Sequence, residues 1–376
     1  MLKNKALKAA KLMVLFLGFA AFFSCVTPPE KKEKGLITGP PVIELLDVPD
    51  HGQKGVLTGR IKNLDGGGYN AAVYVYKNGW YNKPFWKPCE SEIKNDGSFS
   101  CDITTEAGDE FASKIAVFAV KKGIKPRLLA GEKKLPASLY EESAAGREYQ
   151  RMYIDFSGYK WVVSSSKTLM GPGPNYFSEH PEDIFVDEKG YLHLCISKRG
   201  GKWHSSAIVL SESLGYGKYV FYVRGRIDRL DKNTIVGLFT WDNNAPQNKY
   251  REIDIEFSRW GMDAYDNTQF VVQPHKEAEN IRRFNIEIKE TEDTAHVFEW
   301  KRESIYFQSA YISAPFKKPS KKDIIYSWKC TSPDIPPKGR EKVILNFWLL
   351  DGKAPSDGME TEVVITGFEF IPAGKL

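Results

Sequence analysis

Three acidic residues occupy alternate positions in the segment YREIDIEFSRW. Glu252, Asp254 and Glu256 are separated by large apolar residues, and a further apolar residue, Phe257, follows them. This alternation is typical of a half-buried β-strand, so the apolar residues would face a core and the acids would share the opposite face. Like charges about 6–7 Å apart along a strand repel one another, so the row is unfavourable unless it has a chemical use.

The spacing of the acids suits glycoside hydrolysis. A retaining glycosidase needs a nucleophilic and an acid/base carboxyl group about 5–5.5 Å apart. In an extended strand the Cα atoms of Glu252 and Glu256 lie roughly 13 Å apart, and each side chain reaches about 3.5–4 Å. Asp254 would supply a hydrogen bond or shared proton that keeps the nucleophile ionised and raises the pKa of the acid. The alternatives are a cation site built from the three acids, or a solvated face neutralised by Arg251, Arg259, Arg282 and Arg283.

The N-terminus has the pattern of an export signal. Four lysines precede an apolar run from Leu12 to Phe23, which is too short to span a bilayer comfortably and is typical of a signal peptide. Ser24 then precedes Cys25, as in bacterial lipoprotein signals whose cysteine is lipidated after cleavage. We therefore expect a lipid-anchored protein of the bacterial cell envelope (outer membrane, or cell surface/periplasm), with residues 26–40 as a polar tether. Ordinary secretion and an uncleaved anchor are the alternatives.

Export predicts an oxidising compartment. Cys89 and Cys101 flank an NDGS turn signal, so they could meet across two short strands and form a disulfide. Cys195 and Cys330 are expected to be buried thiols. No Cys/His spacing resembles a zinc site, so no cofactor is expected, with a structural calcium left open.

Two folded units are expected after the tether. Short strand patterns separated by turns predict a small β-sandwich over residues 41–135, and residues 136–152 have the composition of a linker. The small unit is rich in aromatic residues, which could stack on sugar rings; the favoured alternative is that they form a sandwich core in a rigid spacer. These residues are Tyr74, Tyr76, Trp80, Tyr81, Phe85 and Trp86.

Residues 153–376 contain ten or more strand patterns and no convincing long amphipathic helix, so we expect two large antiparallel sheets packed face to face. The formal net charge is +5, with acids and bases interspersed. Nothing outside the N-terminal region resembles a basic stripe for nucleic acid. We expect a monomer.

The segments around the acidic strand resemble family 16 glycoside hydrolases, the bacterial β-glucanase group of lichenases and laminarinases. EIDIEF is similar to the active-site strand of that family, GLFTWDN to the strand before it and NTQFVVQP to the strand after it. GGKWHSSAIVLSESLGYGKYVFYVRGRI is similar to the entry strands, and TAHVFEWKRESIYF, VILNFWLLDG and VVITGFEFIP to the later ones. Three alternating acids are expected about once by chance among 376 residues with 48 acids, so this order of segments is the more specific signal.

The resemblance implies an all-β protein whose larger unit is a concanavalin A-like β-jelly-roll. By position, Glu252 would be the nucleophile, Asp254 the assisting acid and Glu256 the general acid/base. Trp241, Trp260, Gln269 and Trp348 would line the cleft, with Asn175 and His180 as further sugar contacts. The absence of an extra residue between Asp254 and Glu256 favours the lichenase type over the bulged laminarinase type, and so β-1,3-1,4 or β-1,4 linkages.

The function expected from these patterns is hydrolysis of internal β-linkages of a polysaccharide with retention of configuration. One rival is a non-catalytic, lectin-like lipoprotein that binds glycans or an envelope partner through the same cleft. Another is a structural envelope lipoprotein. Histidines 204, 275 and 296 are expected at the surface or in packing roles, and Trp161, Trp203 and Trp300 in the core.

Overall fold

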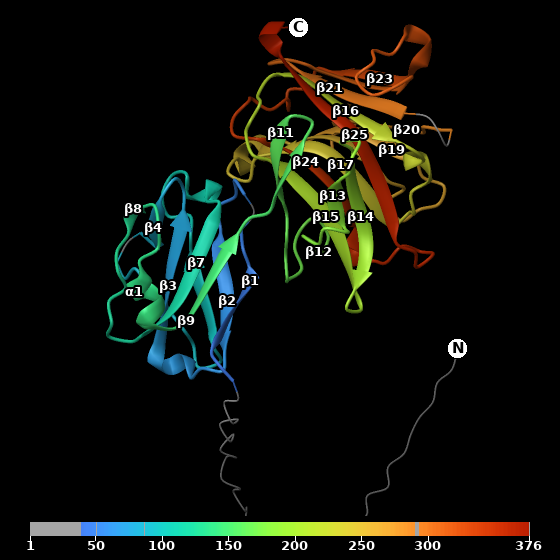
Figure 1. The fold of residues 1–376 in the computed structure, drawn as a ribbon. Helices are drawn as coiled ribbons and strands as arrows, with labels where there is room; N and C mark the ends of the chain where they lie inside the picture. The colour runs from blue at the N-terminus through green and yellow to red at the C-terminus, as the bar shows by residue number, and fades with distance from the viewer. Residues whose placement is uncertain (1–38, 50, 86, 290–292, 376) are drawn as a thin grey trace, which may run out of the picture. The chain divides into compact units, whose positions relative to one another are not determined.

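The computed structural model describes residues 39–49, 51–85, 87–289 and 293–375 (Figure 1). The predicted signal peptide, Cys25 and most of the tether lie outside these residues, so lipidation and envelope localisation stay predictions. Within the described parts of the chain, no helix is long and apolar enough to cross a membrane.

The first part of the chain is a small β-sandwich, as predicted. One sheet has the order β1 (Val42–Asp47), β2 (Val56–Lys62), β6 (Ser98–Asp102). The other has the order β8 (Ala130–Glu132), β4 (Trp80–Lys83), β3 (Tyr69–Tyr76), β7 (Lys114–Lys121), β9 (Ser143–Gln150), with β5 (Ser91–Glu92) also paired to β3. Alternate apolar residues of both sheets, including Leu57, Val73 and Ile115, form the core between them.

One expectation for this unit was wrong, and the structure separates the two alternatives for its aromatic residues. Residues 136–152 are not a linker: they form α1 (Ala137–Glu141) and β9, which pairs with β7 along its length. Tyr74 and Trp80 are buried in a second apolar cluster with Phe118 and Leu139, which agrees with the favoured alternative of a core role. Phe85 is 58% exposed, and Trp86 lies outside the described residues.

The predicted disulfide is absent: Cys89 and Cys101 are free cysteines. The NDGS turn does form, since the Gly97 N–H donates to the Lys94 carbonyl at 2.8 Å. However, β5 on one side of the turn pairs with β3, whereas β6 on the other side pairs with β2. The strands that flank the turn belong to different sheets, and Cys101 is buried in the core between them.

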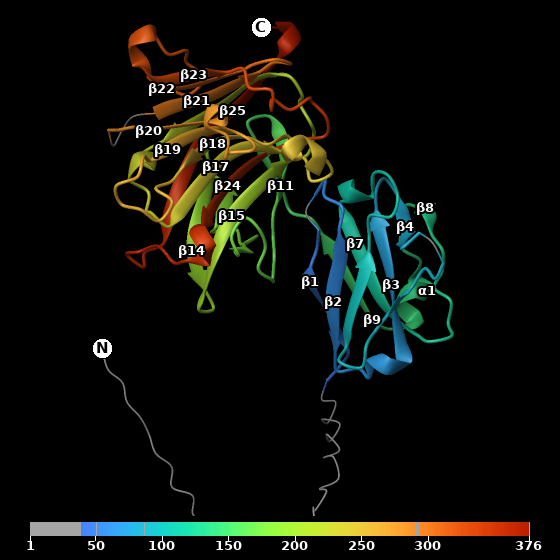
Figure 2. The same ribbon diagram turned by 180° about the vertical axis from the view of Figure 1, so that it is seen from behind.

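The remainder of the chain is a jelly-roll-like sandwich of two layers, antiparallel except for the parallel pairing of β12 with β15, and it is seen from both sides in Figures 1 and 2. The layer that carries the acids has the order β20 (Ile281–Phe284), β19 (Thr268–Val272), β18 (Ile253–Phe257), β17 (Thr234–Trp241), β24 (Lys342–Leu349), β15 (Lys202–Leu210). Beyond it, β11 (Tyr159–Val163) and β12 (Tyr176–Phe177) pair with β15, and β10 (Tyr153–Phe156) pairs with β11.

The second layer has the order β14 (Leu192–Arg199), β25 (Thr361–Pro372), β16 (Gly217–Arg224), β21 (Asp293–Trp300), β22 (Ile305–Ile312), β23 (Ile324–Cys330), with β13 (Ile184–Val186) on β14. The β14–β15 hairpin joins the two layers. The short 3₁₀ segments are η1 (Gly66–Gly68), η2 (Asp109–Phe111), η3 (Ile227–Arg229), η4 (Pro246–Arg251), η5 (Ala278–Asn280), η6 (Lys321–Asp323), η7 (Leu350–Gly352) and η8 (Ala373–Lys375).

Side-chain alternation separates the core from the cleft. In β18 the residues Ile253, Ile255 and Phe257 are fully buried between the layers, as the sequence predicted. Phe270 of β19 stacks on Phe307 of β22, with ring centroids 5.0 Å apart, so the two layers are in direct contact. The alternate residues of the first layer therefore project from its other face, where the acids lie. Trp161 and Trp300 are in the core, as expected.

Candidate active site

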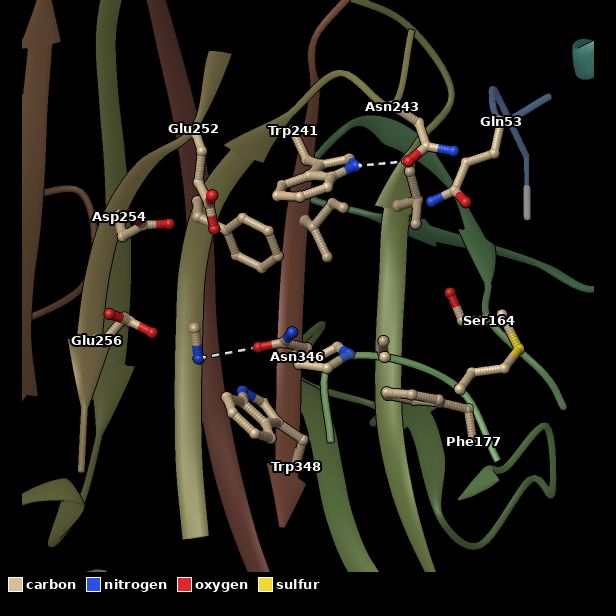
Figure 3. Close-up of a pocket in the computed structure, with 18 of the residues that line it drawn as sticks. Gln53, Ser164, Phe177, Trp241, Asn243, Glu252, Asp254, Glu256, Asn346 and Trp348 are labelled. Carbon is tan, nitrogen blue, oxygen red and sulfur yellow. Dashed lines mark hydrogen bonds between the residues drawn. The ribbon is translucent and has the colours of Figure 1, made fainter. Parts of the chain in front are cut away.

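The three acids project into one cleft of about 630 Å³ (Figure 3). Glu256 lies opposite Gly237 and Asp254 opposite Phe239 on β17, with no register shift between the strands. The strand is therefore unbulged, as the sequence indicated. Glu252 immediately precedes β18 and has an extended backbone, so it continues the alternation. In Figure 3 the carboxyl group of Asp254 points toward that of Glu252.

A left-handed turn delivers Glu252 to the cleft. Lys249, Tyr250 and Arg251 have φ values of 51°, 57° and 53°, a conformation that costs a non-glycine residue roughly 1 kcal/mol or more. The buried carboxyl group of Asp242 holds the turn, because its Oδ2 lies 3.3 Å from Nε of Arg251. Strain of this kind persists where surrounding contacts impose it, and here it precedes a candidate catalytic residue.

Aromatic side chains supply apolar surface in the cleft. Trp241 lines it and stacks on Tyr250 of the left-handed turn, with centroids 4.4 Å apart and planes 6° apart. Trp348 also lines it and meets Trp260 edge to face at 6.3 Å. Trp260, which was expected to line the cleft, is not among its lining residues. It packs against Trp348 instead.

Asn346 is a cleft residue that the sequence analysis missed. It lies on β24 opposite Gly237, and its Oδ1 accepts the Gly237 N–H at 3.0 Å. The side-chain amide is thereby fixed in the cleft floor, next to the acids (Figure 3). A polar residue two positions before Trp348 in an otherwise apolar strand was the available signal, since both share one face. His275, expected at the surface, also lines the cleft together with Gln273.

Asn175, expected as a sugar contact, lies behind the cleft wall instead. It is 3% exposed and does not line the cleft. Its Nδ2 donates to the carbonyls of Pro172 and Leu349, and its Oδ1 accepts from the Ser205 hydroxyl and the Leu349 N–H. Asn175 thus anchors the loop whose residues Met170, Gly171 and Pro172 line the cleft. Ser164 and Phe177, before and after this loop, lie across the cleft from the acids (Figure 3). His180 is exposed and outside the cleft.

Burial raises the pKa of all three carboxyl groups. The pKa of Glu252 is raised to about 8, by burial and then by the negative charge of Glu256, while a hydrogen bond with Asp254 lowers it. Burial and the charges of both glutamates raise the pKa of Asp254 well above its ordinary value. Burial raises the pKa of Glu256 to about 7, against the lowering effects of Gln269 and Arg283.

These shifts depend on one another. Because the charge of Glu256 is one cause of the high pKa of Glu252, a proton on Glu256 favours ionisation of Glu252. A proton on Asp254 turns that carboxyl into a donor toward Glu252, which stabilises the Glu252 carboxylate further. The row therefore favours one ionised glutamate at a time, with Asp254 protonated and able to donate to Glu252.

Gln269 was expected to line the cleft, but it lies one strand to the side. It is opposite Glu256 on β19 and donates from Nε2 to Oε2 of Glu256 at 2.5 Å. Its own Oε1 accepts from Nε of Arg283 at 2.9 Å. The acids are not surrounded by further ligand-type side chains: among the described residues, no cluster of His, Cys, Asp and Glu is arranged to hold a metal ion.

Solved structures similar to this chain include members of glycoside hydrolase family 16. An immunostimulatory antigen and pseudo β-1,3-glucanase of Mycobacterium tuberculosis is 17% identical, with 59% of this chain matching 98% of that protein at a TM-score of 0.44. A mixed-linkage-glucan family 16 enzyme of Bacteroides ovatus, in complex with product, is 12% identical (56% and 94%, TM-score 0.42). A laminarinase from Flavobacterium sp. is 14% identical (56% and 92%, TM-score 0.41). No protein-family model and no curated protein matches the sequence.

Proposed function

We propose that the protein is a retaining endo-glycosidase that hydrolyses internal β-linkages of a polysaccharide. The observation that supports this best is the placement of three carboxyl groups in one aromatic-walled cleft, with a buried Asp254 between two partly exposed glutamates. Retaining hydrolysis needs one ionised and one protonated carboxyl group on the same bond, and coupling within this row favours that division.

In the proposed mechanism, Glu252 attacks the anomeric carbon while Glu256 protonates the leaving oxygen. Asp254 keeps its proton and donates to Glu252, which holds the nucleophile ionised and oriented. Water then enters on the side of Glu256, which accepts its proton as the glycosyl–Glu252 ester is hydrolysed. Because Glu256 must be protonated in the first step, we expect activity to fall as the pH rises through about 7.

The lining of the cleft favours an uncharged polymer. Among the described residues that line it, the formally charged side chains are the three acids, and none is Lys or Arg. A carboxylate or sulfate on the sugar would lie close to this negative row without a cation to offset the repulsion, which is about 3 kcal/mol at 5 Å for an effective dielectric of 20. We therefore propose neutral β-glucans or galactans rather than uronate-containing or sulfated polymers.

The test is turnover of a panel of neutral polysaccharides by the wild type and by Glu252→Gln, with Glu277→Gln as a matched control. Glu277 is exposed and outside the cleft, so that substitution should leave the rate unchanged. We expect a rapid fall in viscosity, a product that first appears as the β-anomer, and at least a 10³-fold loss in Glu252→Gln. Turnover that survives in Glu252→Gln would refute the mechanism, and sugar binding without turnover by the wild type would favour a lectin-like role.

A further inference from the structure

Three residues from adjacent strands form a hydrogen-bonded row that ends on Glu256. Glu256 of β18 is opposite Gln269 of β19, which is opposite Arg283 of β20. Directly opposed residues on one face of an antiparallel sheet lie about 5 Å apart, so their side chains can connect across the strands. Arg283 donates to Gln269 at 2.9 Å, and Gln269 donates to Glu256 at 2.5 Å.

Arg283 determines which way the Gln269 amide faces. A guanidinium group has only donors, so it must meet the carbonyl oxygen of Gln269 rather than its amino group. The opposite orientation would place the amino group against Arg283 and the carbonyl oxygen against Glu256, and both contacts would be mismatched. Arg283 is itself fixed, because its guanidinium group lies over the ring of Tyr265, 4.5 Å from the centroid.

The orientation of Gln269 also distinguishes the two oxygens of Glu256. Oε2 accepts from Gln269, so a proton placed on it would compete with that hydrogen bond. Oε1 is then the favoured position for the proton. A general acid must present its proton to the leaving oxygen, so the oxygen that carries it matters as much as the protonation state.

We propose that Arg283 is a positioning residue for Glu256: it orients Gln269 so that Oε2 is occupied and Oε1 carries the transferable proton. The inference rests on the proposed function, since it assigns a part in the same reaction to a residue outside the cleft. Arg283 acts through Gln269 and touches neither substrate nor the reacting atoms.

The groups around Glu256 determine how its pKa would respond to loss of Arg283. Asp254 and Glu252 flank it on the cleft face, Gly237 and Asn346 lie beside it on β17 and β24, and Gln269 faces it from β19. Gln269 and the Arg283 charge both lower the pKa of Glu256. Removing Arg283 should therefore raise that pKa and shift the alkaline limb of the activity profile upward.

The experiment compares Arg283→Met with Arg282→Met. Arg282 is the neighbouring cation on β20 and lies over the Trp328 ring at 4.8 Å, so its loss changes the net charge equally without breaking the row. We expect Arg283→Met to raise the alkaline limb by about 0.5–1 unit and lower kcat several-fold with little change in KM, whereas Arg282→Met does neither. Arg283→Lys, which keeps the charge and a donor, should restore much of the wild-type profile.

A second measurement is independent of turnover. With ¹³C-labelled glutamate carboxyl groups, the Glu256 signal is assigned by its loss in Glu256→Gln, and its titration is followed in Arg283→Met, Gln269→Leu and the double variant. If Arg283 acts through Gln269, Arg283→Met should add little in the Gln269→Leu background. A titration that Arg283→Met leaves at the wild-type value would overturn the proposal. A shifted titration without turnover of any polysaccharide would instead support the hydrogen-bonded row and refute the proposed hydrolase function.

Discussion

Replacing Asn175 by alanine should destabilise the jelly-roll and loosen the cleft wall together. The substitution removes hydrogen bonds of 2.8, 2.9, 2.9 and 3.2 Å. The Ser205 hydroxyl and both backbone groups of Leu349 lose this partner in a buried setting. At about 1 kcal/mol or slightly more for each group, the free energy of unfolding should fall by about 3–4 kcal/mol. For a unit of this size that corresponds to roughly 10 °C in Tm.

The assay is thermal unfolding of the full chain beside steady-state kinetics, with Ser205→Ala as the control. Ser205→Ala removes one of the same hydrogen bonds, so its Tm should fall by only about 2–4 °C. Because the loop lines the cleft, Asn175→Ala should raise KM several-fold more than it lowers kcat. A direct sugar contact would instead raise KM at an unchanged Tm. A Tm loss no larger than that of Ser205→Ala would therefore refute the anchoring role.

Two further predictions concern packing and pH. A methyl group at Gly237 would lie 2.5 Å from Oδ1 of Asn346, so Gly237→Ala should lower the free energy of unfolding by about 1–3 kcal/mol and reduce kcat/KM. The control is Gly68→Ala, where a methyl group meets nothing within 4 Å. An unchanged kcat/KM in Gly237→Ala would contradict the placement of Asn346. Burial raises the pKa of Asp183, but hydrogen bonds led by Arg199 outweigh it and lower the pKa to about 2. Because Arg199 is partly exposed, solvent screening reduces the contribution to roughly 1–2 kcal/mol, which is present above pH 4 and lost as the pH falls toward 2. Acid unfolding of Asp183→Asn should lack this dependence, and an acid limb identical to that of the wild type would argue against it.

Residue periodicity predicted the elements of this protein better than it predicted their partners. The alternation in EIDIEF placed Ile253 and Ile255 in the core and the acids on the other face, because a two-residue period fixes side-chain direction locally. The disulfide prediction was wrong, because the NDGS turn fixes the chain reversal but not which strand each arm pairs with. That choice depends on contacts between residues distant in sequence, which periodicity does not record.

The same difference between local periodicity and long-range contacts explains which cleft residues were predicted from the sequence. Trp241 lies on β17, next to the acidic strand, and Trp348 lies on β24, one strand further. Both are in regular strands, so alternation predicts which face of the sheet each side chain occupies. Asn175 lies in a loop, where no period indicates direction, and its hydrogen-bond partners include Leu349, 174 positions away. Asn346 was missed because its role depends on Gly237, the residue opposite it on β17, whose missing side chain leaves space for the amide.

The row of three acids is stable in the fold because its charge is smaller than its composition suggests. Three ionised carboxylates in one cleft would repel one another, and the raised pKa values show that the row resists full ionisation. Coupling leaves fewer than three charges on the row, and in the proposed mechanism the donor on Asp254 favours the charge on Glu252. At the other end of the row, the hydrogen bond that Gln269 donates to Glu256 limits how far the pKa of Glu256 is raised. In the proposed mechanism this repulsion separates a nucleophile, a tuning acid and a proton donor, and substitution at any one position should change the titration of the other two.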